Sequence, residues 1–309
     1  MKIKEDYFLN KASIAKHSAS NNVFFNSFDY TWAFGKENLP LSDRKFTIIK
    51  EGEGPGSVDD GKVFYQYNND WFRCDDFINS HSSKYHILFG GCSETEGMGG
   101  NVNDCWAKML HTKLSKYYDI GGYYNVGRAG YGWHQIINNF FVYSKKYGKP
   151  THYFVMLPNI GRRYEWDNQD NTWKYYQKYV DRDISLGYTE TGNFTNKNLI
   201  DIKDQKDELM NFIIGWKIFE EYCKSENVKL ITTSWDTLEH HNICLFGQNE
   251  SFFRMDGLEF ERFILDARPN LKLAEDDLEK RDQHKGRLWH EWWTYKFINQ
   301  IDKIGAFND

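Results

Sequence analysis

The chain has 309 residues, a formal net charge of −5 at pH 7 and an aromatic content of 17%. This length suffices for one sizeable core, and the acidic balance, with no basic stripe to neutralise phosphates, argues against nucleic acid as a partner. No run of about 18 apolar residues appears, so we expect no membrane-spanning helix and no membrane partner. Residues 1–17 are charged and lack an apolar stretch, so we predict no secretory signal.

Five cysteines stand at positions 74, 92, 105, 223 and 244. Their odd number, without C-x-x-C spacing, argues against a disulfide framework and against a zinc site. We therefore predict no metal and no cofactor, and synthesis in the reducing cytoplasm. The sequence leaves open the oligomeric state and whether the protein becomes part of a larger particle.

The two parts of the chain differ in their periodicity. Residues 1–80 show no helical period, and Gly52-Glu-Gly-Pro-Gly56 marks a loop. We predict an irregular or β-rich N-terminal extension over 1–80, followed by an α/β domain over 81–309. From Tyr85 onward, short apolar runs alternate with helical patterns, which is typical of parallel βαβ units. The predicted strands are 86–89, 123–126, 152–157 and 228–233.

Amphipathic patterns after these strands predict helices over 131–147, 207–224 and 288–301. In the first of these helices, the residues expected on the buried face are Ile136, Ile137, Phe140, Phe141 and Ser144. Two longer stretches, at about 160–203 and 235–281, interrupt the alternation. Insertions of this length in a compact domain are usually functional lids or small subdomains.

The first predicted strand runs directly into Gly91-Cys-Ser-Glu-Thr-Glu-Gly97. Ser93 therefore stands at the carboxyl end of a strand, where open α/β sheets bind their ligands. A glycine-flanked turn of this kind is also how hydrolases expose a nucleophilic hydroxyl beside backbone N–H groups. The alternative is that Ser93 or Thr95 only caps the following helix.

The next two strands also end in residues that suit an anion. Asn125-Val-Gly-Arg-Ala-Gly-Tyr-Gly132 leaves the second strand, and its glycines allow close approach to backbone N–H groups. Asn159 follows the third strand, where a side-chain amide can donate a hydrogen bond to a charged oxygen. Gly127 and Asn159 could instead serve only their turns.

The segment Asp282-Gln-His284, before the last helix, offers a general base and a carboxylate that could orient it. His290, six residues further on, is a second candidate for the base, although packing at the start of the helix suits it better. We reject a P-loop because no lysine stands at the required place after Gly91 to Gly97, and a G-x-G-x-x-G spacing is absent. A metal site at Asp282, His284 and His290 lacks H-E-x-x-H support.

Together these segments resemble the SGNH/GDSL hydrolase superfamily. Gly91 to Gly97 matches its first block, G-D-S-x-T-x-G, except that Cys92 replaces the aspartate. Upstream, Asn69-Asp-Trp-Phe-Arg73 resembles the N-x-x-G-F-R lead-in of carbohydrate-esterase-like members, with Trp71 in place of the glycine. The resemblance covers roughly 69–300 and depends on short blocks.

The other blocks follow in the family's order. Asn125 to Gly132, with Gln135 shortly after, is similar to the second block, N-x-G-x-x-G-x-G. Pro158-Asn159 stands where the third block ends in its asparagine. Asp282 and His284 stand where the last block carries D-x-x-H, here shortened to D-x-H.

The resemblance implies a flavodoxin-like three-layer α/β/α fold with a mainly parallel sheet, to which the N-terminal extension and the two insertions are added. It implies a serine esterase with Ser93 as nucleophile, His284 as general base and Asp282 orienting that base. The N–H groups of Ser93 and Gly127 and the side chain of Asn159 would form the oxyanion hole. The expected substrate is a small-molecule or carbohydrate ester, such as an O-acetyl group on a sugar.

Three alternatives remain open at this stage. The replaced aspartate and the shortened last block would also suit a catalytically idle SGNH-like domain that binds glycans or serves a structural role. The same residues could transfer an acyl group to a sugar instead of to water. Cys92 could act as the nucleophile, although a small buried thiol is its more usual role.

Overall fold

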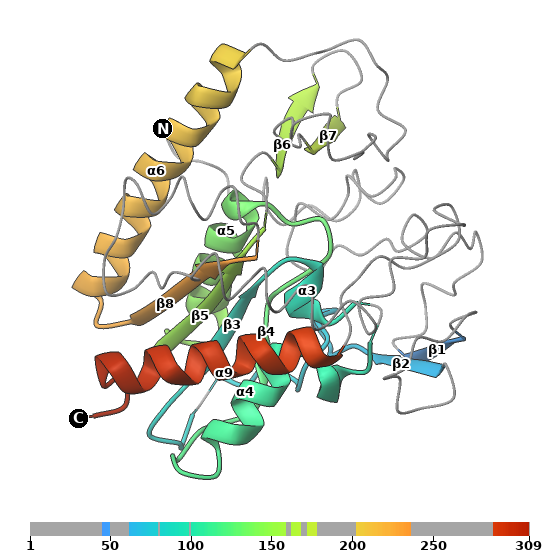
Figure 1. Ribbon diagram of the computed structural model, residues 1–309, viewed down its shortest axis with the longest axis vertical. Helices are drawn as coiled ribbons and strands as arrows, with labels where there is room; N and C mark the ends of the chain where they lie inside the picture. The colour runs from blue at the N-terminus through green and yellow to red at the C-terminus, as the bar shows by residue number, and fades with distance from the viewer. Residues whose placement is uncertain are drawn as a thin grey trace.

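The computed structural model describes residues 45–49, 62–79, 81–98, 100–158, 162–167, 172–177, 202–235 and 287–308. At its centre lies a four-stranded parallel sheet in the order β4-β3-β5-β8 (Figure 1). The bounds of the strands, in chain order, are β3 Ile87–Gly91, β4 Tyr124–Asn125, β5 His152–Leu157 and β8 Lys229–Ser234. This order is that of the first four strands of a flavodoxin-like sheet, which confirms the predicted α/β class.

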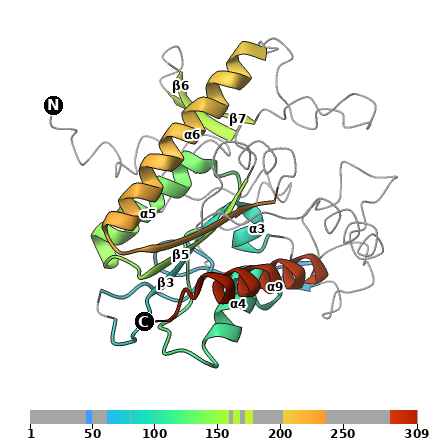
Figure 2. The ribbon, with the colours of Figure 1, turned by 60° about the vertical axis from the view of Figure 1, so that its left-hand side comes forward.

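Helices cover both faces of this sheet (Figures 1 and 2). One face packs against α4 (Trp106–Leu114) and α9 (Arg287–Ile304), and the other against α5 (Trp133–Tyr147) and α6 (Ile202–Ser225). Two separate apolar clusters fill these two interfaces. The strands are buried on both sides, which explains why they are continuous apolar runs without alternation. The three-layer arrangement is therefore as predicted.

Most predicted boundaries lie within a few residues of the observed ones, and on the buried face of α5 the prediction was right for Ile136 and Phe140 but wrong for Phe141. Phe141 is 40% exposed, whereas Asn139 and Tyr143 are fully buried. Both polar side chains have partners: Asn139 Nδ2 donates to the Val126 carbonyl at 3.1 Å, and the Tyr143 hydroxyl lies 2.7 Å from His86 Nε2. Hydropathy alone undervalues such polar residues, because it does not register hydrogen bonds to distant partners.

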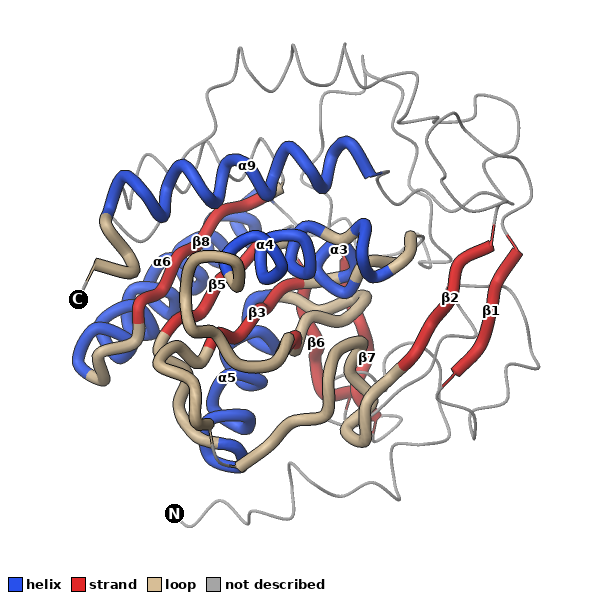
Figure 3. Tube along the Cα trace, turned by 90° about the horizontal axis from the view of Figure 1, so that it is seen from below, coloured by secondary structure: helices blue, strands red, loops and turns tan. Residues whose placement is uncertain are grey.

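The N-terminal part contributes an antiparallel pair, β1 (Lys45–Ile49) and β2 (Lys62–Gln66), which Figure 3 shows apart from the central sheet. The chain after β2 runs beside β4. Asp75 N donates to the Tyr123 carbonyl at 3.1 Å, and Tyr123 N donates to Asp75 Oδ2 at 2.8 Å. These bonds occupy backbone groups at the outer edge of the sheet, which would otherwise be open to pairing with another chain.

The first predicted insertion contains an antiparallel hairpin of β6 (Arg162–Asp167) and β7 (Thr172–Gln177). Residues 160–161, 168–171 and 178–201 of that insertion, and residues 236–281 of the second, lie outside the described residues. Short elements α3 (Ser93–Glu96) and η2 (Val102–Asp104) lie between β3 and α4. Among the helices that the structure describes, none has the length and apolar content needed to cross a membrane.

Candidate active site

The turn after β3 brings Ser93 to the first position of α3 (Figure 1). Gly91 has φ of 154°, and a Cβ at this position would lie 2.0 Å from Thr95 Oγ1 and 2.7 Å from the Met156 carbonyl oxygen. A side chain is therefore excluded by both sterics and backbone conformation. The helix-capping position is held by Cys92, whose side chain makes no capping hydrogen bond. Ser93 is thus not the cap residue.

Ser93 is largely buried, with 7% of its surface exposed, whereas the neighbouring Cys92 is 0% exposed. The Ser93 hydroxyl lies 3.9 Å from Cys92 Sγ. Within the described part of the chain, nothing accepts a hydrogen bond from the Ser93 N–H. Among the described residues, the Ser93 hydroxyl therefore contacts only the Cys92 sulfur and its N–H has no acceptor, while the Cys92 side chain is fully buried.

The turn after β4 packs directly on α3. Asn125 Nδ2 donates to the Thr95 carbonyl at 2.7 Å, and a Cβ on Gly127 would lie 2.8 Å from both Cβ and Cγ2 of Thr95. The Thr95 side chain therefore fills the space left by Gly91 on one side and Gly127 on the other. This gives a physical reason for a threonine and two glycines at these spacings.

The predicted role of Gly127 as an oxyanion donor stays a prediction. Its N–H donates to Asn125 Oδ1 at 2.8 Å, inside its own turn. An oxyanion would have to share this hydrogen or displace the amide oxygen. The turn itself is rigid, because Asn125 Nδ2 also lies 2.8 Å from the Tyr123 hydroxyl.

Glu96 forms a second connection between the two turns. It is 1% exposed, and its Oε2 accepts from Ala129 N at 2.6 Å while its Oε1 accepts from the Tyr67 hydroxyl at 3.2 Å. Burial is the main cause that raises the pKa of Tyr67 well above its ordinary value, so this hydroxyl stays a proton donor. No local pattern in the sequence indicates this role, since the partners lie about 30 residues away on either side.

The lead-in segment also reaches α3. Arg73 is 2% exposed, and its guanidinium donates to the carbonyls of Gly97, Phe64 (2.7 Å) and Gly100 (2.8 Å), while lying 4.0 Å from the Tyr65 ring centroid. These hydrogen bonds from both terminal nitrogens, together with the Tyr65 ring, offset the cost of burying the cation, while Nε has no partner among the described residues. Arg73 therefore fixes the end of the helix that begins with Ser93.

Trp71, which stands in place of a glycine in the lead-in resemblance, has φ of 63°. The backbone thus keeps a left-handed conformation that glycine adopts without cost. The turn is held by Asn68, whose Oδ1 accepts from the N–H groups of Asp70 and Phe72, both at 2.9 Å. The sequence comparison began at Asn69, one residue too late to include this asparagine.

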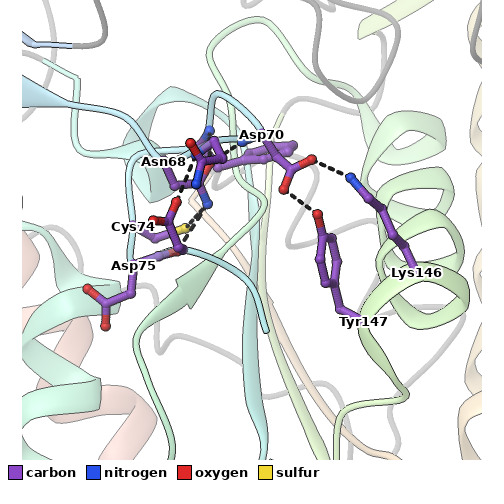
Figure 4. A network of polar contacts seen from close by, with 9 residues as sticks. Asn68, Asp70, Cys74, Asp75, Lys146 and Tyr147 are labelled. Atoms are coloured by element: carbon purple, nitrogen blue, oxygen red, sulfur yellow. Dashed lines mark hydrogen bonds and ion pairs between the residues drawn. The ribbon is translucent and has the colours of Figure 1, made fainter. Parts of the chain in front are cut away.

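Figure 4 shows Asp70 between two side chains of α5. Its Oδ1 lies 2.6 Å from Lys146 Nζ, and its Oδ2 accepts a hydrogen bond from the Tyr147 hydroxyl. In the same view, Asn68 Nδ2 reaches Cys74 Sγ and the Asp75 carbonyl. The lead-in turn is therefore fixed to α5 on one side and, through Arg73, to the end of α3 on the other.

On the opposite side of α3, the Glu94 carboxylate faces the last helix. Glu94 Oε2 lies 3.8 Å from His290 Nε2, and both residues are buried. The neighbouring Cys105 thiol donates to the Thr95 carbonyl at 3.2 Å, and burial raises the pKa of Cys105 to about 12. This thiol is consequently a structural donor and not a nucleophile.

Of the five predicted site residues, the structure describes Ser93 and Gly127 and brings them to adjacent turns at one edge of the sheet. Asn159, Asp282 and His284 lie outside the described residues. The pairing of Gly91 with Met156 places the end of β5 beside the Ser93 turn. In the ranges that are described, no cluster of three His, Cys, Asp or Glu side chains could hold a metal ion, and Cys74, Cys92, Cys105 and Cys223 are free thiols.

No protein-family model and no curated protein sequence matches this chain. Among solved structures, a psychrotrophic esterase EstA from Pseudoalteromonas sp. is 13% identical, with coverage of 71% of this chain and 98% of that one and a TM-score of 0.38. An acetyl xylan esterase, AlAXEase, is 11% identical, with coverage of 70% and 99% and a TM-score of 0.38.

A member of the lipolytic protein G-D-S-L family from Veillonella parvula is 12% identical, with coverage of 69% and 96% and a TM-score of 0.30.

Proposed function

We propose that this protein is an SGNH/GDSL-like serine hydrolase that cleaves an ester through an acyl-enzyme on Ser93. The observation that supports this most directly is the placement of Ser93 at the carboxyl end of β3, with a hydroxyl and a backbone N–H that bond to no backbone group of the described residues. A purely structural serine in a buried turn would be expected to bond its hydroxyl to the backbone. Here the hydroxyl has only the distant Cys92 sulfur as a described partner.

The reaction follows from the chemistry of these groups. The Ser93 hydroxyl attacks the ester carbonyl carbon as its proton passes to His284, the proposed base, which Asp282 orients. The Ser93 N–H, assisted by Asn159 and Gly127, stabilises the oxyanion. The alcohol then leaves with the proton from His284, and water releases the acid by the reverse sequence. Each preorganised oxyanion donor contributes on the order of 3 kcal/mol to such a step.

The finer proposal is that the ester is an O-acetyl group on a carbohydrate. It rests on the lead-in resemblance, to which the structure adds that the Asn68 to Arg73 segment contacts the nucleophile's helix directly through Gly97. The corresponding probe is an acetylated xylo-oligosaccharide, compared with p-nitrophenyl butyrate. A higher kcat/KM for release of acetate from the sugar than for release of p-nitrophenol from the butyrate ester supports the carbohydrate proposal.

The test of the serine mechanism is covalent labelling with a fluorophosphonate probe, followed by peptide mapping. We expect modification of Ser93 in the parent chain and in Cys92→Ala, and none in Ser93→Ala. Hydrolysis of p-nitrophenyl acetate should fall to the uncatalysed rate in Ser93→Ala alone. Equal hydrolysis by the parent and by Ser93→Ala would exclude Ser93 as the nucleophile, and absence of both labelling and hydrolysis in the parent would favour the catalytically idle domain.

A further inference from the structure

The residue after the proposed nucleophile is connected to the last helix by a buried pair of ionisable side chains. Glu94 is 7% exposed and His290 is 4% exposed, and Glu94 Oε2 lies 3.8 Å from His290 Nε2. A carboxylate this deeply buried is costly unless a donor or a cation faces it. His290 comes from the first turn of α9, nearly 200 residues further along the chain, so the contact is a tertiary one.

The hydrogen bonds of His290 fix which of its nitrogens carries the proton. Trp106 N, the first backbone N–H of α4, donates to His290 Nδ1 at 3.3 Å. Nδ1 is therefore an acceptor, and in the neutral ring the proton is on Nε2, which faces Glu94. The imidazole thus lies between α4 and α3, and its Nε2 makes an electrostatic contact of 3.8 Å, longer than a hydrogen bond, with the carboxylate beside Ser93.

The surrounding contacts hold the Glu94–His290 pair in place within the protein interior. Thr294 Oγ1 lies 2.8 Å from the His290 carbonyl and 3.3 Å from the Trp106 carbonyl. The Trp106 ring stacks on Phe297 with centroids 4.4 Å apart. Arg287 Nε lies 3.6 Å from Asp104 Oδ1 at the start of α9. The beginnings of α3, α4 and α9 therefore meet around His290.

We propose that Glu94 and His290 form a positioning pair for the reaction of Ser93, an inference that rests on the proposed serine hydrolase function. The pair holds the first turn of α3 against α4 and α9, which sets the direction of the Ser93 hydroxyl. It also places the His290 imidazole against the Glu94 carboxylate, whose negative charge opposes an oxyanion forming at the adjacent residue. The segment with the proposed base leads into α9 at Arg287, so the same contact anchors the point where that segment ends.

Two substitutions of His290 separate the contact with Glu94 from general packing. His290→Asn keeps an acceptor for the Trp106 N–H but removes the group that faces Glu94. His290→Gln places an amide N–H near the position of Nε2. We expect kcat for p-nitrophenyl acetate, and the rate of fluorophosphonate labelling of Ser93, to fall about 10- to 100-fold in His290→Asn with KM changed less than about twofold. His290→Gln should recover part of this loss.

The matched control is His152→Asn, because His152 is equally buried, at 3% exposed, and bonds the Ala306 carbonyl at 2.8 Å away from the site. This variant should lose thermal stability as His290→Asn does, but should keep kcat within about twofold. Equal losses of kcat in both variants would show general loosening and would overturn the inference. The inference would also be overturned if His290→Asn kept full activity while Ser93→Ala was inactive.

A second route to the same contact is Glu94→Gln, which changes few atoms and serves if His290→Asn does not fold. We expect a smaller fall in kcat, and a double variant Glu94→Gln/His290→Gln whose loss is less than the sum of the two single losses in free energy. Strict additivity would show that the residues act independently and would overturn the pair. If Ser93→Ala is as active as the parent, the proposed function itself fails, and this is seen without any His290 variant.

Discussion

The side chain of Thr95 occupies the volume that a side chain at Gly127 would need. The two residues belong to successive strand-to-helix turns, and a Cβ on Gly127 would stand 2.8 Å from Cβ of Thr95. Real Cβ atoms essentially never approach so closely, so the glycine is required by its neighbour and not by its own backbone. The geometry of the Ser93 turn is thereby tied to that of the next turn.

We therefore expect Gly127→Ala to push α3 away from the β4 turn. The free energy of unfolding should fall by about 1–3 kcal/mol, as for other overpacked sites, and Ser93 labelling should slow by more than tenfold. Urea denaturation and the fluorophosphonate labelling rate measure the two effects. Gly100→Ala is the control, since a Cβ there meets nothing within 4 Å. Similar results for the two variants would refute the argument.

At Trp71, unlike most positions, we expect the glycine variant to be more stable than the alanine variant. Because φ at this position is 63°, Trp71→Gly should be more stable than Trp71→Ala by about 1 kcal/mol, although both lose the ring. Trp292, which lies in the regular helix α9, is the control, and there the glycine variant should be the less stable by about 1 kcal/mol. Urea midpoints of the four variants give the comparison, and the same order at both positions would contradict it.

The contacts of Asp70 should contribute more to the stability of the fold than an exposed ion pair of similar length. Asp70→Asn weakens the contacts to Lys146 and Tyr147, and we expect a loss of about 1–2 kcal/mol, limited because the Lys146 side chain is 49% exposed. Lys149→Gln breaks the 2.8 Å pair with Glu226, whose side chains are both more than 40% exposed, and should cost less than about 0.5 kcal/mol. Thermal unfolding distinguishes the two. Equal shifts of the melting temperature in the two variants would show that the Asp70 contacts contribute no more than an exposed ion pair.

His86 predicts how stability depends on pH. Burial, with His81 stacked on it at 3.5 Å, lowers the pKa of His86 from 6.5 to about 3. Between these values the unfolded chain binds a proton at this residue and the folded chain does not. Stability should therefore fall as the pH drops from 6.5 towards 3, by up to about 1.4 kcal/mol per pH unit from this group, and be unaffected by it above 6.5.

The measurement is the urea midpoint at pH 7 and at pH 4.5. His86→Gln should reduce the difference between the two midpoints, because it removes the titrating group. His134→Gln, at an exposed position, should leave the difference unchanged. An unaltered pH dependence in His86→Gln would mean that other groups cause it.

The sequence predicted the strands and helices of the central domain well, because a parallel sheet covered on both faces needs apolar runs that are easy to see. The range 152–157 coincides with β5, and Ser93 lies at the end of β3 as expected. Asn159, Asp282 and His284 remain predictions that depend on the resemblance.

What the sequence could not supply are contacts whose partners lie far apart along the chain. Glu96 with Ala129, Arg73 with Gly97 and Glu94 with His290 each join segments that carry no local sign of the other. The error at Phe141 of α5 has a related cause, because the buried side-chain amide of Asn139 donates to the distant Val126 carbonyl. The N–H of Gly127 is a different case, since its acceptor, Asn125 Oδ1, lies only two residues away in the same turn.

The hydrogen bonds of Arg73 limit where the chain can be truncated. Its guanidinium joins carbonyls on both sides of residue 80, and Asp75 occupies the outer edge of β4. A chain begun at residue 81 would keep every strand of the central sheet, yet it would expose that edge and leave the end of α3 without its cation. Truncation at the apparent boundary should therefore yield a protein prone to edge-to-edge association, and the shortest well-behaved fragment should begin before β2.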